Sequence, residues 1–350
     1  MTQISATHTK ALITGVAGLV LTGEEQAFLH DARPCGLILF ARNCASHDQI
    51  RALVASFKAA VGSDDVLVLI DQEGGRVQRL RPPLGRALPP AASYADLYSV
   101  SPEAAVRAAR SAARLVAHDL RTLGINTNCA PVLDVPVAGA HDIIGNRAYG
   151  ADAGQIASLG RAVAEGYMAG GVLPVIKHIP GHGRALADSH LDLPVVTASH
   201  AELSATDFAP FKMLADLPAA MTAHVVFAAL DGEQPASTSA KVTSCIIRGE
   251  IGFEGLLMSD DLSMKALTGA MTSRAEAVMA AGSDVALHCN GDLSEMRAAA
   301  LGVPVLKGHA LRRFNAALAI FDSVEDFDVR GAETVLAGVL AGRTPASESV

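Results

Sequence analysis

One short stretch of the chain concentrates residues that could do acid–base chemistry. The segment 177–190 reads KHIPGHGRALADSH and contains three histidines, an aspartate and a lysine. The apolar run at 172–176 before it is typical of a buried strand, so these polar residues follow the carboxyl end of a strand. Asp188 stands two residues before His190, and a carboxylate beside an imidazole can orient it and stabilise its charge. That makes His190 a usable general acid or base near neutral pH. A solvated loop whose histidines only cap or pack is the plainer alternative.

A second stretch, IDQEGGRVQR at 70–79, also follows an apolar run. Asp71 would stand at the strand tip, where its two oxygens can accept hydrogen bonds from neighbouring hydroxyls of a polyol. The twin glycines permit a tight turn that would direct Arg76 and Arg79 back to the same place. A phosphate-binding loop is disfavoured, because the stretch lacks the lysine and the Ser or Thr of a P-loop.

A third stretch, MSDDLSM at 258–264, ends an apolar run and begins a helical pattern. Asp260 would be the last strand residue, and a carboxylate there can attack an anomeric carbon to form a covalent intermediate. Asp261 or Ser263 could instead cap the following helix, which gives one of the two acids a purely structural role.

Short apolar runs alternate with longer amphipathic stretches along the chain. Eight strands are expected, several of them nearly continuous in Leu, Val and Ile as in parallel sheets buried on both faces: 11–17, 36–40, 66–71, 125–133, 172–178, 219–226, 255–260 and 284–289. The expected helices are 23–32, 47–61, 103–122, 153–169, 202–215, 239–250, 264–281, 291–301, 308–321 and 331–341. Eight strand–helix units predict an α/β fold, the (β/α)₈ TIM barrel, with a doubly wound sheet as the alternative. We expect one domain over 1–350, with a frayed tail at 344–350.

The barrel prediction has a functional consequence, because active sites of this fold lie where the strands end at the C-terminal face. The polar residues at the expected strand ends are Asp71, Glu73, Arg76, Arg79, Asp134, Lys177, His178, His224, Asp260, Asp261 and Asn290. Some of these can be structural: Asp134, for instance, could equally pin a loop.

Composition narrows the class of protein. Half of the residues are apolar and 18% are charged, and the net charge of −8 argues against nucleic acid or an anionic membrane as a partner. Five scattered cysteines without metal-binding spacing fit reduced thiols better than a disulfide framework. The N-terminus has no secretory signal pattern and no run is long enough to span a bilayer. We therefore expect a cytoplasmic protein. We also expect a monomer.

Together these motifs resemble family 3 glycoside hydrolases, in particular the single-domain bacterial β-N-acetylglucosaminidases (β-N-acetylhexosaminidases) of peptidoglycan recycling. The resemblance covers about residues 11–300, with the motifs in the order of the barrel strands. It rests on IDQEGGR at 70–76, GNRAYG at 145–150, KH at 177–178, PGHG at 180–183, DSH at 188–190, MTAH at 221–224 and SDDLSM at 259–264.

The resemblance implies a role for each matching residue. Asp260 would be the nucleophile of a retaining mechanism, and His190, held by Asp188, would be the acid/base. The substrate would be N-acetylglucosamine joined to an anhydro-N-acetylmuramoyl peptide or related muropeptide, with no metal and no organic cofactor. The terminal sugar's hydroxyls would be held by Asp71, Arg79, Arg147, Lys177 and His178.

The sequence departs from the family pattern at two positions. Ile179 stands where relatives usually carry Phe, and Arg184 stands where an acidic residue is common, so loop packing or the aglycone contact could differ. Two other functions stay open. One is a non-catalytic sugar-binding barrel. The other is a metal-dependent barrel hydrolase, because imidazoles and a carboxylate suit Zn²⁺; its ligands would be His178, His182, Asp188 and His190.

Overall fold

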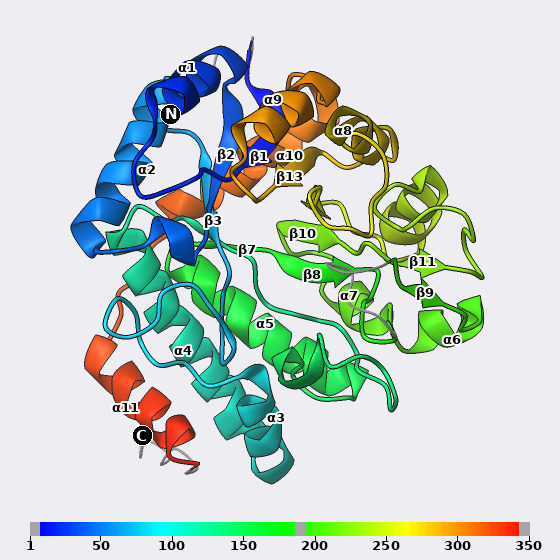
Figure 1. Ribbon diagram of the computed structural model, residues 1–350. Helices are drawn as coiled ribbons and strands as arrows, with labels where there is room; N and C mark the ends of the chain where they lie inside the picture. Colours follow the sequence, from blue (N-terminus) through cyan, green and yellow to red (C-terminus); the bar gives the residue numbers. More distant parts are fainter. Residues whose placement is uncertain (1–7, 186–192, 343–350) are drawn as a thin grey trace.

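The protein is described by a computed structural model that covers residues 8–185 and 193–342. A parallel sheet winds into a barrel at its centre, in the order β7-β6-β3-β2-β1-β13-β12-β10-β8 (Figure 1). The strands at the two ends of this order, β7 and β8, follow each other in the chain and are separated by Val175 alone, so they close the barrel. The bounds are β1 (Lys10–Thr14), β2 (Pro34–Leu39), β3 (Leu67–Ile70), β6 (Thr127–Asn128), β7 (Leu173–Pro174), β8 (Ile176–Ile179), β10 (Ala219–Thr222), β12 (Leu256–Asp261) and β13 (Val285–His288).

Helices surround the barrel, which confirms the predicted (β/α)₈ architecture (Figure 1). Ser101 caps α4 as the sequence indicates, since its side chain accepts from the Ala104 amide and Pro102 is the first helical residue. Among the described residues the helices are α1 (Gly23–Ala32), α2 (His47–Val61), α3 (Ala91–Val100), α4 (Pro102–Thr122), α5 (Ala153–Ala169), α6 (His200–Ala205), α7 (Ala209–Met213), a π-helix (Val242–Glu250), α8 (Met271–Ala280), α9 (Leu293–Gly302), α10 (Gly308–Leu318) and α11 (Val329–Leu340).

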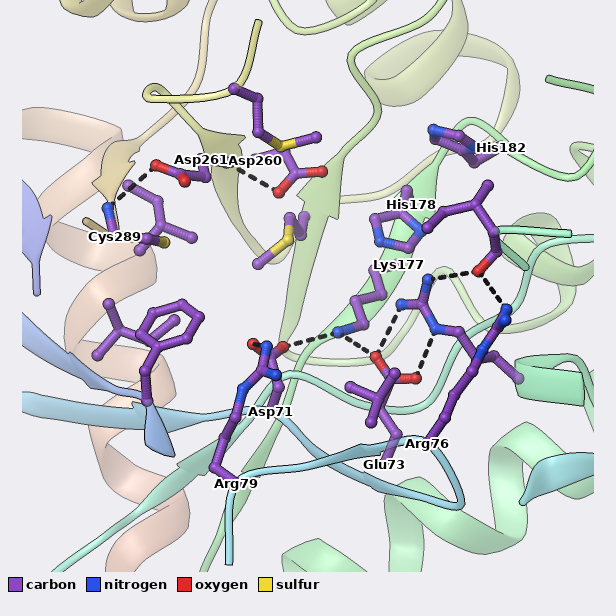
Figure 2. A pocket seen from close by; sticks show the side chains of 18 of the residues that line it. Asp71, Glu73, Arg76, Arg79, Lys177, His178, His182, Asp260, Asp261 and Cys289 are labelled. Carbon is purple, nitrogen blue, oxygen red and sulfur yellow. Dashed lines mark hydrogen bonds and ion pairs between the residues drawn. The ribbon is translucent and has the colours of Figure 1, made fainter. Parts of the chain in front are cut away.

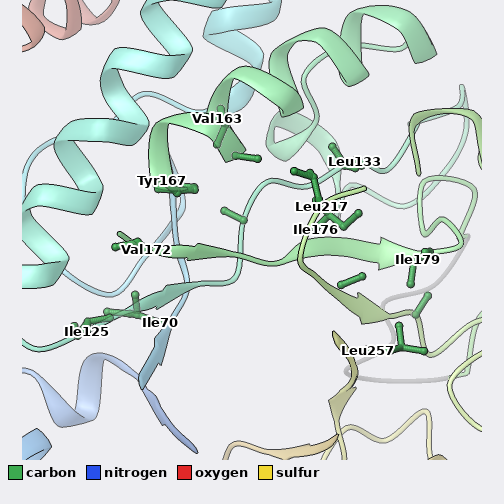
Figure 3. Packing of buried hydrophobic residues seen from close by; sticks show 14 of the residues in the cluster. Ile70, Ile125, Leu133, Val163, Tyr167, Val172, Ile176, Ile179, Leu217 and Leu257 are labelled. Carbon is green, nitrogen blue, oxygen red and sulfur yellow. The ribbon is translucent and has the colours of Figure 1, made fainter. Parts of the chain in front are cut away.

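Successive side chains along each strand point to opposite faces of the sheet, and this alternation builds two apolar layers. On β3, Leu67 and Leu69 belong to the cluster inside the barrel, whereas Val68 and Ile70 belong to the cluster between the barrel and the helices. Figure 3 shows the outer layer, where Tyr167 and other apolar residues of α5 lie over β7 and β8. Both faces of each strand are therefore buried, as the continuous apolar runs predict.

The same alternation decides which polar residues reach the mouth of the barrel. Asp71, Lys177 and Asp260 each stand two residues after an inward-facing apolar residue, at or just beyond the carboxyl end of a strand. All three line one cavity at that end of the barrel. The period of two therefore predicts their direction as well as their position.

Several predicted elements differ in extent. The strand expected at 125–133 is a continuous strand only at Thr127–Asn128, and Pro131 beyond it has no amide proton to donate. Pairing resumes at Val132, which forms an isolated parallel bridge with Lys177. The helix expected at 202–215 is divided into α6 and α7. The helix expected at 264–281 begins only at Met271, since a loop containing Gly269 occupies its first turns.

Four features of the fold have no counterpart in the prediction. They are α3, a parallel pair formed by β9 (Val195–Val196) and β11 (Val226–Phe227), and an antiparallel hairpin formed by β4 (Gln72–Gly74) and β5 (Val77–Gln78). The fourth is the π-helical geometry of Val242–Glu250, where an α-helix was expected. In the described part of the chain, none of the helices has both the length and the apolar run that crossing a bilayer requires.

Candidate active site

An open cavity of about 510 Å³ occupies the mouth of the barrel (Figure 2). Its polar lining comes from the loops after several different strands, which is how this fold builds its active sites. The polar and sulfur-bearing lining residues are Arg42, Asp71, Glu73, Arg76, Arg79, Arg147, Lys177, His178, His182, Met221, Asp260, Asp261, Met264, Cys289 and Asn290.

An ion-pair network forms one wall of this cavity. It consists of Arg79, Asp71, Lys177, Glu73 and Arg147, in that order (Figure 2). Lys177 Nζ lies 2.9 Å from Asp71 Oδ1 and 2.7 Å from Glu73 Oε1. Arg79 Nη2 donates to Asp71 Oδ2 at 2.8 Å, and Arg147 donates to both Glu73 oxygens at 2.8 Å. The network holds three cations against two carboxylates and fixes all five side chains.

The network keeps its charges in spite of burial. Burial alone would raise the pKa of Glu73, but Lys177 and Arg147 hold it at about 2. Lys177 and Arg79 likewise hold the pKa of the buried Asp71 carboxyl below its usual range. Burial would lower the pKa of Lys177, but Asp71 and Glu73 raise it above its ordinary value. The wall thus presents a fixed array of donors to a polar ligand.

The glycine turn predicted at 74–75 positions two members of this wall. Gly74 and Gly75 have φ of 112° and 55°, which favours glycine, and they turn the chain from β4 into β5. The turn brings Arg79 onto Asp71, and it brings Arg76 to the loop 142–144.

Arg76 in turn holds the loop that carries Arg147. Its guanidinium pairs with the Asp142 carboxylate at 3.1 Å and donates to the carbonyl oxygens of Asp142, Ile143 and Ile144. Arg147 follows directly on a 3₁₀ turn, Gly145–Arg147. Arg76 therefore supports the wall formed by the ion-pair network, and it lines the cavity as well.

A second polar cluster stands beside the network. Asp134 is fully buried, and its Oδ2 lies 2.7 Å from His178 Nδ1. Its Oδ1 accepts from the backbone amides of His178 and His182, at 3.1 Å and 2.7 Å. Burial lowers the pKa of His182 to about 4, so this imidazole is neutral near pH 7. Asp134 thus joins the strand-end residue to the turn that follows it.

The two acids at the end of β12 take different roles. Asp260 faces the cavity, and its Oδ1 accepts from the Asp261 amide at 2.8 Å (Figure 2). Asp261 bonds Ser263 and accepts from the Cys289 amide at 3.0 Å, which ties the end of β12 to the loop after β13. The helix-capping alternative for Asp261 and Ser263 is wrong, because α8 begins later and Ala270 precedes it without a side-chain cap.

The structure brings six of the eight predicted site residues to one cavity: Asp71, Arg79, Arg147, Lys177, His178 and Asp260. The other two, Asp188 and His190, lie outside the described residues, so their roles stay predictions. His224, expected at a strand end near the mouth, is instead buried. Its ring bonds the Ser237 hydroxyl and the Asp261 carbonyl, and it supports the site from behind.

Sequence reasoning gave no role to two residues that the site depends on. The sequence predicts Glu73 only as a strand-end residue, yet its side chain pairs with both Lys177 and Arg147. For Asp134 the sequence leaves a site role and a loop role open, and the structure shows its side chain bonded to His178, 44 positions away. Asp134 follows an apolar run directly and Glu73 stands three residues after one, which is the signal available in the sequence; their partners are distant in the chain.

The two departures from the family pattern lie away from the cavity. Ile179 is fully buried in the outer apolar layer (Figure 3). Arg184 donates to Asp207 at 2.7 Å and pairs with Glu202 at 2.8 Å. Neither residue lines the cavity described above, so an effect on ligand contact would be indirect.

Comparison with known proteins decides the family. A family model described as the glycosyl hydrolase family 3 N terminal domain matches residues 10–318. The chain belongs to glycosyl hydrolase family 3. It is therefore a glycoside hydrolase, and both the predicted family and the predicted enzyme class are confirmed.

Individual relatives match this family 3 hydrolase over most of its length, and solved structures of relatives match its fold. A beta-hexosaminidase of Bordetella avium (strain 197N) is 39% identical over 283 residues, 80% of each chain. NagZ from Neisseria gonorrhoeae, solved in complex with N-trifluoroacetyl-D-glucosamine, is 32% identical with a TM-score of 0.84, over 96% of this chain and 99% of that one. A structure of that protein in complex with zinc ion is 30% identical with a TM-score of 0.81, over 94% and 97%.

The metal-site alternative has limited support from the described residues. Within 8–185 and 193–342, no three His, Cys, Asp or Glu side chains are grouped so that they could hold a metal ion. His178 and His182 have ring centroids 5.5 Å apart, and the other two expected ligands, Asp188 and His190, lie outside the described ranges.

Proposed function

We propose that the protein is a retaining β-N-acetylglucosaminidase that releases terminal, non-reducing N-acetylglucosamine from muropeptides. The observation that carries the proposal is the arrangement in the cavity. One carboxylate, Asp260, faces a pocket whose opposite wall is a rigid array of hydrogen-bond donors (Figure 2). Such a wall suits the several hydroxyls of a sugar, and the carboxylate suits attack on its anomeric carbon.

The ion-pair network is suited to hold the sugar in place. Arg79, Lys177 and Arg147 are donors only, and Asp71 can accept from hydroxyls with the lone pairs its cations leave free. Because the ion pairs fix these side chains beforehand, the sugar loses little of its binding energy to ordering them. The proposed sugar-binding residues are Asp71, Arg79, Arg147, Lys177 and His178.

The proposed reaction is a double displacement with net retention. Asp260 attacks C1 as the bond from C1 to the aglycone oxygen breaks, and His190 donates a proton to the departing oxygen. Water then attacks C1, His190 takes its proton, and the bond to Asp260 breaks. Asp188 orients His190; the roles of both residues rest on the sequence resemblance.

The substrate assignment rests on the relatives. The N-trifluoroacetyl-D-glucosamine bound to NagZ from Neisseria gonorrhoeae and the beta-hexosaminidase relatives favour an N-acetylated hexose. The resemblance to enzymes of peptidoglycan recycling favours a muropeptide aglycone, and with it a site of action in the cytoplasm.

Hydrolysis of p-nitrophenyl glycosides tests the proposal directly. The wild-type enzyme is expected to prefer the N-acetyl-β-glucosaminide over the β-glucoside, and Asp260→Ala should lose nearly all activity on both. Asp261→Asn removes the neighbouring charge as a matched control. Wild-type rates from Asp260→Ala, or no turnover of any glycoside, would refute the proposed nucleophile.

A metal-dependent hydrolase is the second candidate, and the zinc complex of the Neisseria gonorrhoeae protein is the observation in its favour. Two of the four expected ligands, His178 and His182, lie side by side. Hydrolysis of the same p-nitrophenyl glycosides, measured after dialysis of the enzyme against EDTA, distinguishes the metal-free mechanism from the metal-dependent one. Unchanged rates support the metal-free mechanism, and loss of activity that Zn²⁺ restores supports the metal.

A further inference from the structure

A carboxylate–imidazole pair other than the predicted acid/base pair is fully built at this cavity. Asp134 Oδ2 lies 2.7 Å from His178 Nδ1, and Asp134 is completely buried. His178 lines the cavity at the end of β8, beside Lys177. The mechanism proposed above gives Asp134 no role.

The surroundings of Asp134 fix which ring nitrogen of His178 carries a proton. Asp134 is fully buried, and both of its oxygens lie against nitrogen atoms, so its carboxylate is the acceptor in each of these contacts. Its Oδ1 is already occupied by the amides of His178 and His182. The contact at Oδ2 therefore requires a proton on His178 Nδ1.

The proton on Nδ1 determines what the other nitrogen can do. Since Nδ1 is turned to Asp134, the opposite edge of the ring, which carries Nε2, is the edge directed to the cavity. In a neutral imidazole with its proton on Nδ1, Nε2 is an acceptor.

An acceptor at this place complements the wall beside it. The three cations of the ion-pair network, Arg79, Lys177 and Arg147, can only donate, and the two carboxylates of that network already receive two or three charged hydrogen bonds each. Each sugar hydroxyl brings a proton as well as an oxygen. An unprotonated His178 Nε2 next to Lys177 can accept one such hydrogen bond.

We propose that Asp134 is a positioning residue that holds His178 with its proton on Nδ1, so that Nε2 accepts a hydrogen bond from a hydroxyl of the bound sugar. The proposal rests on the proposed function for the identity of the ligand. The state of the His178 ring can be measured without any substrate, so the two can fail separately.

Asp134→Asn isolates this role from a general support of the fold. The amide oxygen of Asn can still accept from the two backbone amides, and its NH₂ group then faces His178 Nδ1. That group must donate, so Nδ1 becomes the acceptor and the proton moves to Nε2. The sugar then meets a donor where it had an acceptor, at nearly unchanged geometry.

NMR of ¹⁵N-labelled histidine reads the ring state directly. The signal of His178 is assigned by its loss in His178→Ala. The wild type is expected to show the proton on Nδ1, and Asp134→Asn is expected to show it on Nε2. A wild-type ring that is doubly protonated, or protonated on Nε2 alone, overturns the proposal, even where the protein hydrolyses glycosides as proposed.

Kinetic measurements test the expected effect on sugar binding. For p-nitrophenyl N-acetyl-β-glucosaminide, Asp134→Asn should lower kcat/KM by about 10- to 100-fold, mostly through KM, because a hydroxyl donor is left facing a donor. The double variant with His178→Ala should be no worse than His178→Ala alone. Substrates that each lack one sugar hydroxyl locate the contact. One of them should bind the wild type more weakly than the complete substrate does, and should bind Asp134→Asn no more weakly than the complete substrate does.

A matched control distinguishes a lost contact from a weakened fold. Asp284 is another buried carboxylate, bonded to the Leu257 amide, Arg248 and Arg313, and none of these lines the cavity. Asp284→Asn should lower Tm and leave KM unchanged. If Asp134→Asn keeps the wild-type kcat/KM, or if its cost adds fully to that of His178→Ala, Asp134 does not act through His178. If the wild type hydrolyses no N-acetylglucosaminide, the proposed function fails and the NMR result alone decides the role of Asp134.

Discussion

Replacing Glu73 by glutamine removes one charge from the ion-pair network and keeps the shape of the side chain. Glu73 receives two hydrogen bonds of 2.8 Å from Arg147 and lies 2.7 Å from Lys177 Nζ. Its side chain is only 7% exposed, and that of Lys177 only 3%. The cations that lose their partner therefore stay desolvated, and Glu73→Gln should destabilise the fold.

The size of this effect follows from the pKa of Glu73. The pKa falls from the ordinary 4.5 to about 2, and at about 1.4 kcal/mol per pKa unit the native state gains about 3 kcal/mol. Breaking a buried ion pair by removing one partner costs about 3–5 kcal/mol in other proteins, which agrees. For a chain of 350 residues this corresponds to a drop in Tm of about 4 °C.

The loss of stability in Glu73→Gln should depend on pH. A carboxyl with a depressed pKa adds stability above its unfolded pKa and loses it as the pH falls toward its folded pKa. The difference in unfolding free energy between wild type and Glu73→Gln should therefore be constant above about pH 5.5. It should shrink as the pH falls from 4.5 toward 2. Urea unfolding at several pH values measures it.

Activity and a control complete the test. Displacement of Arg147 and Lys177 should reduce kcat/KM for p-nitrophenyl N-acetyl-β-glucosaminide by about 100-fold. Glu254→Gln removes an ion pair with Arg313 whose acid is 72% exposed, and it should cost less than about 1 kcal/mol. Equal losses of stability in the two variants, or a Glu73→Gln protein as stable and active as the wild type, would refute the account of the network.

Two further predictions concern the acid/base and the thiols. His190→Ala should slow substrates with alkyl or sugar leaving groups by about 10²- to 10⁴-fold and aryl glycosides much less, measured as kcat/KM across leaving groups; equal losses on all of them would contradict the acid role. Cys289 lines the cavity, but burial raises the pKa of its thiol well above the ordinary value. Iodoacetamide at pH 8 should therefore label the exposed Cys245, leave Cys289 unlabelled and leave the activity unchanged, and peptide mass mapping would show which thiol reacts.

The period of the apolar residues predicted most of the fold. Each expected strand overlaps an observed strand, and α1, α2 and α5 have the predicted bounds. These elements carry strong local signals: continuous apolar runs, capping residues and glycines just beyond helix ends. Since inward positions alternate, the same pattern also placed Asp71, Lys177 and Asp260 at the mouth of the barrel.

What the sequence could not supply are contacts between distant residues. The bonds from Asp134 to His178 and from Glu73 to Arg147 join positions 44 and 74 residues apart, and no local periodicity records them. The bond from the Cys289 amide to Asp261, which ties the end of β12 to the loop after β13, is another such contact. The roles of buried polar residues are therefore visible only once the barrel has closed.

Covalent trapping tests the central claim most directly. An activated 5-fluoro derivative of N-acetylglucosamine slows the release of a glycosyl-enzyme, so the adduct can be located by mass spectrometry of peptides. A mass increase of one fluorinated N-acetylglucosaminyl group on the peptide containing Asp260, absent from Asp260→Ala, is the predicted result. Turnover of the reagent without any adduct, or an adduct on a different carboxylate, would contradict the mechanism.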